Sequence, residues 1–232
     1  MTEIWLPGDP PVAVLLRRSA RARRLSLRVS RLDGRVTLTI PAGASEAEAA
    51  AFARSRADWV RAARARAAPV VPVRHGTVLP VAGRPLAVTP APVRSARIEA
   101  GALLVPPDPA RAGARVAAYL KLAARDALAE AADRHAAALG RGHAGIVLRD
   151  TRSRWGSCTH EGRLMFSWRL AMAPPEVLDY VAAHEVAHLE QMNHSPAFWA
   201  VVARLMPDHA RHRRWLRHEG DALMRYDFTG AR

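Results

Sequence analysis

Apolar and polar side chains alternate in two short segments near the start of the chain. Residues 25–29 read Leu-Ser-Leu-Arg-Val and residues 36–40 read Val-Thr-Leu-Thr-Ile, so every second side chain is apolar. This period of two is typical of a strand with one buried face. Asp33-Gly34 lies between the two segments and favours a tight turn between antiparallel strands. We therefore expect a β-hairpin in this region.

A helical pattern follows the hairpin. Residues 45–48, Ser-Glu-Ala-Glu, have the serine and glutamate spacing of a capping box, so we expect a helix over residues 49–68. Strand-like segments separated by glycines return between Gly76 and Pro107. The proline cluster at residues 106–109 is the best candidate for a boundary, which predicts a β-rich N-terminal region with one helix over residues 1–107.

The second half of the chain mixes helical and strand patterns. An alanine-rich segment over residues 111–139 has helical composition and is followed by Gly140, a residue that often ends a helix. Two further strands and three further helices are predicted at residues 146–148, 164–170, 174–190, 195–206 and 208–218. This order predicts an α+β fold, with the C-terminal domain over residues 108–232.

The sharpest chemical signal is the motif His184-Glu185-x-x-His188. Residues four apart lie on one face of a helix, so the two imidazoles can bind one metal ion. Apolar residues precede them at helical spacing, which places both histidines on a core-facing stripe. Glu185 flanks that face, where its carboxylate can take a proton from a metal-bound water. The alternative is a hydrogen-bonded histidine pair with Glu185 as an ion-pair partner, but burying two imidazoles on an apolar stripe without a ligand is costly.

A catalytic zinc site usually has three protein ligands and leaves the fourth position to water. His194, six residues after the second histidine of the motif, is the leading third ligand, because the offset equals that of the pattern H-E-x-x-H-x-x-G-x-x-H. Gln191 stands where this pattern has glycine, so we expect the turn to be made at Asn193, which tolerates a left-handed conformation. The alternative ligands are carboxylates of later helices, Asp208 or Glu219.

These residues predict a zinc-dependent hydrolase. Bound zinc lowers the pKa of its water to about 7, and Glu185 would accept the proton and later pass it to the leaving group. A second donor is needed for the oxyanion that develops on the attacked carbonyl. The sequence offers Tyr180, Arg154 and His212 for this role and does not rank them.

The chain is strongly basic, with 35 lysine and arginine residues against 21 acidic ones and a net charge of +14. Residues 17–31 contain seven arginines and no acidic residue. Such a surface can contact nucleotides, nucleic acid or an acidic protein, and it is also common as a solvated face. The chain has no secretory pattern and no apolar run long enough to cross a bilayer, and its single cysteine, Cys158, excludes an internal disulfide. We therefore expect a cytoplasmic protein without a membrane partner.

The motifs together resemble the YgjP-like metallopeptidase family, which is related to the SprT and WLM groups of zincin-like proteins. The resemblance extends from about Arg17 to Glu219. The segments that carry it are Arg17-Arg18-Ser19, Arg154-Trp155-Gly156-Ser157-Cys158, His184-Glu185-x-x-His188 and Asn193-His194-Ser195-x-x-Phe198-Trp199. It implies a zincin-like C-terminal domain with Glu185 as the general base. It also implies three zinc ligands, His184, His188 and His194.

Three functions are compatible with these features. The leading one is a zinc metallopeptidase that cleaves peptide or protein substrates. In the second, the same site hydrolyses nucleotides whose phosphates are held by arginines of residues 17–31, or it cleaves proteins bound to nucleic acid, as the SprT-like resemblance suggests. In the third, the zinc is structural, but an intact Glu185 beside an open coordination position argues against this.

Overall fold

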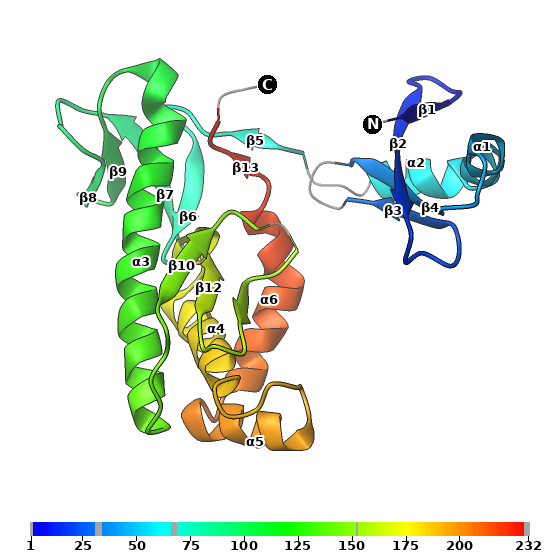
Figure 1. Ribbon diagram of the computed structural model, residues 1–232. Coiled ribbons are helices and arrows are strands. Elements are labelled where there is room, and N and C mark those ends of the chain that lie inside the picture. Colours follow the sequence, from blue (N-terminus) through cyan, green and yellow to red (C-terminus); the bar gives the residue numbers. More distant parts are fainter. Residues whose placement is uncertain (1, 31–33, 66–68, 152, 230–232) are drawn as a thin grey trace. The chain divides into compact units, whose positions relative to one another are not determined.

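The computed structural model describes four stretches of the chain, residues 2–30, 34–65, 69–151 and 153–229. Contacts between residues divide the chain into two compact units, residues 1–70 and 71–232 (Figure 1). Both units contain helices and strands, which confirms the predicted α+β class.

A four-stranded sheet forms most of the first unit. Its strands are β1 (Glu3–Leu6), β2 (Val12–Ser19), β3 (Ser26–Val29) and β4 (Val36–Pro41), in the order β1-β2-β4-β3. The central strands β2 and β4 are parallel, and each outer strand pairs antiparallel with its neighbour. Leu27 of β3 lies opposite Leu38 of β4, so the predicted hairpin is confirmed. Asp33 of its predicted turn lies outside the described residues.

Two short helices, α1 (Glu46–Ser55) and α2 (Ala57–Ala65), pack on one face of this sheet. Ser45 and Glu48 form the predicted capping box. Glu48 Oε2 accepts a hydrogen bond from the Ser45 N–H at 2.8 Å, and Ser45 Oγ accepts one from the Glu48 N–H at 3.2 Å. Both bonds pair backbone donors that the first turn of a helix cannot satisfy itself.

The prediction of one continuous helix over residues 49–68 is wrong, because the chain leaves the helical conformation at Arg56, where φ is −112°. Ala49, Ala53 and Val60 are all buried and keep the spacing of a single helical face. The apolar pattern therefore does not mark the break. Residues 66–68 of the prediction lie outside the described part of the chain.

The second unit begins with another four-stranded sheet and a long helix. They comprise β6 (Val78–Val81), β7 (Arg84–Pro90), β8 (Arg97–Glu99) and β9 (Ala102–Val105), in the order β6-β7-β9-β8, and α3 (Ala112–Ala138). Leu79 and Leu103 of the sheet share one buried core with Val116 and Leu120 of α3. The predicted boundary after residue 107 therefore falls inside this unit, because the apolar core is continuous across the proline cluster.

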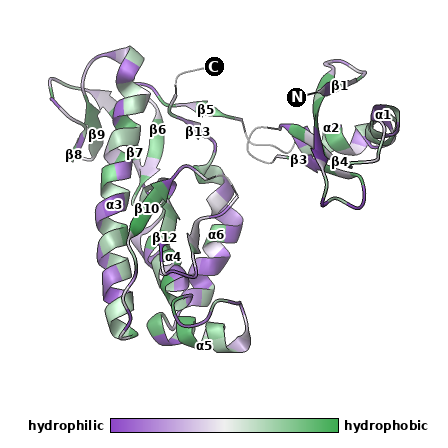
Figure 2. Cartoon of the chain, viewed as in Figure 1, coloured by the Kyte–Doolittle hydropathy of each residue, from purple (hydrophilic) through white to green (hydrophobic). Residues whose placement is uncertain are grey.

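Helix α3 carries both hydrophilic and hydrophobic residues along its length (Figure 2). Among the helices that the structure describes, none is both long and apolar enough to cross a membrane.

A three-stranded sheet and three helices complete the second unit. They are β10 (Ile146–Arg149), β11 (Gly156–Cys158) and β12 (Leu164–Ser167), in the order β10-β12-β11, with α4 (Pro175–Ala187), α5 (Pro196–Leu205) and α6 (His209–Leu223). A short parallel pair joins the two ends of the unit, β5 (Val71–Pro72) with β13 (Tyr226–Asp227).

The strand predicted over residues 164–170 is shorter than expected. After β12 the chain forms a buried 3₁₀ turn, η2 (Trp168–Met172). The buried guanidinium of Arg169 donates to Asp150 Oδ1 at 2.7 Å, which accounts for a charged side chain inside the core.

Candidate metal centre

Helix α4 presents two histidines near its C-terminal end. Proline at the start of the helix is tolerated because the first N–H groups have no partner within a helix. Val177 and Val181 are buried, and they place the following turns of α4 against the core. His184 lies in the last turn, and His188 is the residue that caps the helix, with nearly helical φ and ψ of −66° and −17°. The two imidazoles therefore lie one turn apart on the same side.

The connection between α4 and α5 places His194 beside them. The chain turns back after α4, where the Gln191 N–H donates to the Ala187 carbonyl at 3.0 Å. Asn193 does not adopt the expected left-handed conformation. Its side chain shapes the turn instead, because Asn193 Oδ1 accepts from the Ser195 N–H at 3.1 Å.

The ligand nitrogens of His184, His188 and His194 all lie within 4.8 Å of one another. His184 Nε2 and His194 Nε2 are 3.0 Å apart. His188 Nδ1 is 3.0 Å from the Gln191 carbonyl oxygen, an acceptor that keeps the proton on Nδ1 and leaves Nε2 as a ligand. Imidazole nitrogens at about 2.0–2.1 Å from a tetrahedral zinc ion are about 3.4 Å from one another. The donor set of this cluster therefore fits a metal ion.

Burial keeps the two helical imidazoles neutral. Burial, followed by the charges of His188, His194 and Arg213, lowers the pKa of His184 to about 3. Burial also lowers the pKa of His188, although its hydrogen bond to Gln191 opposes this effect. A neutral imidazole has the lone pair that a metal ion requires, so His184 and His188 are in their metal-binding form at neutral pH.

Aromatic side chains of α5 pack around the histidines. The Phe198 ring stacks on His188 with centroids 4.4 Å apart, and Trp199 is the next residue of α5. Arg213 of α6 lies over the Trp199 ring, 4.3 Å from its centroid. Burial raises the pKa of Tyr180, and the Arg213 charge opposes this rise. The sequence does not predict that Arg213 lies near the histidines, because several arginines occur together in α6. Only the packing of α6 on α4 distinguishes Arg213 from its neighbours.

Glu185 lies against the edge strand β11. Its side chain is buried, and a Cβ added at Gly156 would lie only 2.5 Å from Glu185 Oε1. Position 156 therefore admits the carboxylate only because it is glycine. Burial raises the pKa of Glu185 to about 8, and the Arg154 charge opposes this rise. The sequence does not predict this contact, since the two residues are far apart in the chain.

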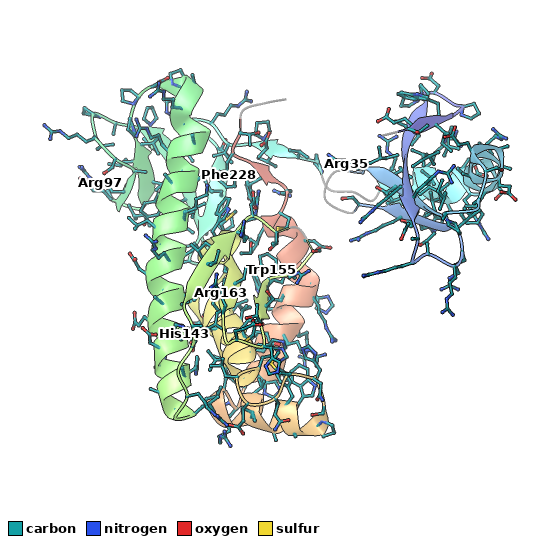
Figure 3. All side chains as sticks on the ribbon, in the orientation of Figure 1. Arg35, Arg97, His143, Trp155, Arg163 and Phe228 are labelled. Atoms are coloured by element: carbon teal, nitrogen blue, oxygen red, sulfur yellow. The ribbon has the colours of Figure 1, made fainter. Side chains whose placement is uncertain are left out.

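The loop before β11 is held in place by Trp155, which lies beside α6 (Figure 3). A Cβ at Gly220 of α6 would lie 3.0 Å from the indole ring. Thr151 Oγ1 donates to the Arg154 carbonyl at 2.7 Å, and the Ser167 N–H donates to the Trp155 carbonyl at 2.8 Å. These contacts support the strand against which Glu185 packs.

The other predicted site residues lie at different places. The Tyr180 ring is buried, with its centroid 6.0 Å from that of the first histidine of α4, whereas Arg154 is exposed. The structure does not bring His212 into the histidine cluster, because its Nε2 is 2.9 Å from Asp208 Oδ2. His212, Asp208 and Glu219 instead line a separate hollow beside Pro174. Within the described residues, neither alternative carboxylate joins the three histidines.

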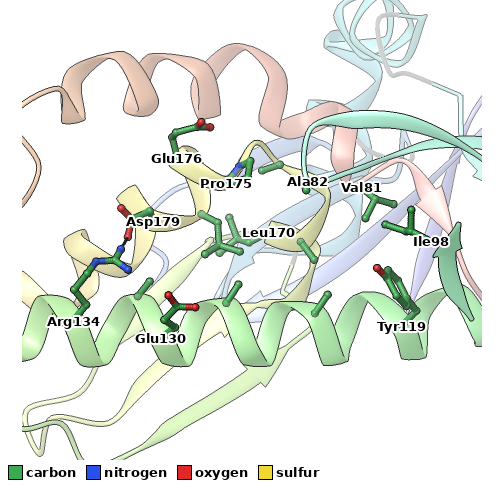
Figure 4. Close-up of a pocket in the computed structure, with 16 residues that line it drawn as sticks. Val81, Ala82, Ile98, Tyr119, Glu130, Arg134, Leu170, Pro175, Glu176 and Asp179 are labelled. Atoms are coloured by element: carbon green, nitrogen blue, oxygen red, sulfur yellow. Dashed lines mark hydrogen bonds and ion pairs between the residues drawn. The ribbon is translucent and has the colours of Figure 1, made fainter. Parts of the chain in front are cut away.

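A second hollow, of about 420 Å³, lies between α3 and the first turns of α4 (Figure 4). Its wall is mostly apolar and includes Tyr119, Leu170 and Leu178. Arg134 Nη2 and Asp179 Oδ1, 2.5 Å apart, form an ion pair at one end. None of the three histidines lines this hollow, so it is separate from the metal centre.

The fold is α+β, three imidazoles cluster on and beside one helix, and that helix also carries a buried glutamate. This combination is typical of metal-dependent hydrolases. The comparison with protein families narrows this class, because a model of the YgjP-like metallopeptidase domain matches residues 23–219. The chain belongs to the YgjP-like metallopeptidase family, which confirms the resemblance seen in the sequence.

Among solved structures, the chain is similar to the metallopeptidase zymogen of Pyrococcus abyssi abylysin. The match covers 40% of this chain and 95% of the abylysin chain. The two are 19% identical, and the TM-score is 0.36. No curated protein matches the chain.

Proposed function

We propose that this protein is a zinc-dependent peptidase in which His184, His188 and His194 hold the metal and Glu185 is the general base. The proposal rests on the convergence of three imidazole nitrogens within 4.8 Å, on and beside the helix that carries a buried glutamate. Three nitrogen ligands with an open fourth position form the ligand set of a catalytic zinc ion. When bound, zinc would polarise the attacked carbonyl and lower the pKa of water to about 7.

Without a metal ion, the raised pKa of Glu185 would leave this carboxyl mostly protonated at neutral pH. The positive charge of bound zinc would favour the ionised carboxylate, which would then accept a proton and return it to the leaving amine. The Glu185 side chain lies against β11, which is an edge strand, since the sheet order is β10-β12-β11. An extended peptide can add to such an edge through backbone hydrogen bonds. We therefore expect the substrate to lie along β11, with its scissile bond near Glu185.

The test separates metal binding from chemistry by measuring zinc content and cleavage of unfolded casein on the same samples. The variants are Glu185→Gln and His194→Ala. Their controls are Glu176→Gln, at an exposed position in the first turn of α4, and His218→Ala, at an exposed position of α6. We expect Glu185→Gln to keep its zinc and lose activity by about 10²-fold or more. We expect His194→Ala to lose the zinc, and both controls to behave as the parent.

Undiminished cleavage by Glu185→Gln would remove this residue from the mechanism. Zinc binding by His194→Ala as tight as that of the parent would remove His194 from the set of ligands. Nucleoside triphosphates are incubated in parallel. Release of phosphate or pyrophosphate by the parent but not by Glu185→Gln, without casein cleavage, would reassign the site to phosphoanhydride hydrolysis.

A further inference from the structure

The sheet of the first unit has one face that no described helix of that unit covers. Strand pairing shows which residues share a face, and α1 and α2 pack on the face that bears Val14, Leu16 and Leu38. The opposite face, called the open face below, alternates with it along each strand. The open face includes Trp5, Leu15, Arg17, Arg28, Thr37 and Thr39.

The open face carries unneutralised positive charge. Arg17 and Arg28 are exposed and form no ion pair within the part of the chain that the structure describes. Glu3 lies on the same face, in the row that runs Glu3, Leu15, Thr37 and Arg28 across the four strands. At about 4.8 Å per strand, about 14 Å separates the two ends of this row, which exceeds the Debye length of about 8 Å at physiological salt. Glu3 therefore does not neutralise Arg28. Arg17 is the diagonal neighbour of Glu3 across β1 and β2, about 8 Å away, so Glu3 offsets part of the Arg17 charge and leaves that of Arg28.

The loop that joins β2 to β3 extends this charge. Arg21, Arg23 and Arg24 of the loop are all exposed. The loop leaves the sheet at the end where Arg17 lies beside Thr39. The acidic residues of α1 and α2 belong to the helices on the other side of the sheet. The open face and its loop are therefore suited to a polyanion.

A large aromatic surface accompanies the charge. Trp5 is 60% exposed on β1, although an indole ring is normally largely buried. The hydroxyls of Thr37 and Thr39 lie on the central strand β4, and Leu15 lies beside Thr37. Exposed aromatic rings, arginines and hydrogen-bonding side chains on a sheet are the features that bind single-stranded nucleic acid. A duplex has its bases already stacked and offers none to Trp5.

We propose that the open face binds single-stranded nucleic acid, with phosphates on Arg17 and Arg28 and a base stacked on Trp5. The proposal depends only on the first unit and is independent of the peptidase activity proposed for the second.

The test measures the fluorescence anisotropy of labelled oligo(dT) and oligo(U), each about 20 nucleotides long, with the full chain across a salt series. Loss of two phosphate contacts in Arg17→Gln/Arg28→Gln should reduce the slope of log K against log salt by about 1.4. Trp5→Ala should weaken binding about 10-fold. The matched controls are on the helices, at exposed positions: Arg54→Gln/Arg64→Gln for charge and Trp59→Ala for the aromatic ring. Both should bind within about twofold of the parent.

Absence of binding to either oligonucleotide at low salt would overturn the proposal. It would also fail if the helix controls weakened binding as much as the variants of the open face. Binding of polyglutamate with the same losses in the same variants, together with displacement of the oligonucleotide, would assign the face to an acidic protein instead.

Discussion

Replacing Gly156 with alanine tests whether β11 fixes the position of Glu185. A Cβ at position 156 would lie 2.5 Å from Oε1, 2.6 Å from Cγ and 2.7 Å from Cδ of Glu185. Atoms in contact are normally about 3.5–4.0 Å apart, so the two groups must separate by about 1 Å. Glu185 is only 5% exposed and is fixed in the last turns of α4, so it has little room to retreat.

We expect Gly156→Ala to lower kcat/KM for a fluorescent casein substrate about 100-fold. A catalytic group displaced by about 1 Å loses roughly this factor, which corresponds to about 2.7 kcal/mol of transition-state stabilisation. The added methyl group should also lower the free energy of unfolding by about 1–3 kcal/mol, because the contact is overpacked. Rates are therefore measured on zinc-loaded protein well below its Tm, and zinc content and Tm are measured on the same sample.

Gly142→Ala is the matched control, since a Cβ at that position would meet no atom within 4 Å. This variant should keep the parental activity and Tm. The reasoning is refuted if Gly156→Ala is folded, zinc-loaded and as active as the parent. If Glu185→Gln is inactive and Gly156→Ala is fully active, Glu185 is still the general base, but β11 does not determine its position.

Two charged groups away from the metal centre provide further predictions. Arg169 is buried and donates to a carboxylate at 2.7 Å and to two backbone carbonyls at 3.2 and 2.9 Å. Arg169→Met should lower the free energy of unfolding, measured in urea, by about 3 kcal/mol. The control Arg163→Met, at an exposed position, should change it by less than about 0.5 kcal/mol. Equal effects of the two substitutions would contradict this prediction. Burial would raise the pKa of Asp179, but His135 and Arg134 hold it below its ordinary value of 3.8. Asp179→Asn should therefore destabilise the protein by about 2 kcal/mol at pH 7, and the difference should shrink below about pH 4 as the parental carboxylate takes up a proton. Thermal melts at pH 7 and pH 3 check this, and a difference that widens on acidification would contradict it.

Much of the secondary structure was predictable because it depends on neighbouring residues. The helix predicted over residues 111–139 is observed as α3 over 112–138. The alternating segments 25–29 and 36–40 match the paired strands β3 and β4 to within one residue at each end. Alternation shows that one face of a strand is buried, but it does not show what buries it. The division of the chain therefore differs from the predicted boundary after residue 107, since only the packing of β6, β7 and β9 on α3 shows that these elements share a core.

The predicted metal ligands and the position of the base depend on different kinds of information. His184, His188 and His194 occur on one helix and the connection that follows it, so their spacing in the sequence already implies that they can meet. The position of Glu185 depends on a strand from elsewhere in the chain, and a glycine there is compatible in the sequence with a turn, a bulge or a close approach. Only the fold distinguishes these possibilities. For this reason Glu185→Gln asks whether the carboxylate is needed, whereas Gly156→Ala asks whether the fold must hold it where it lies.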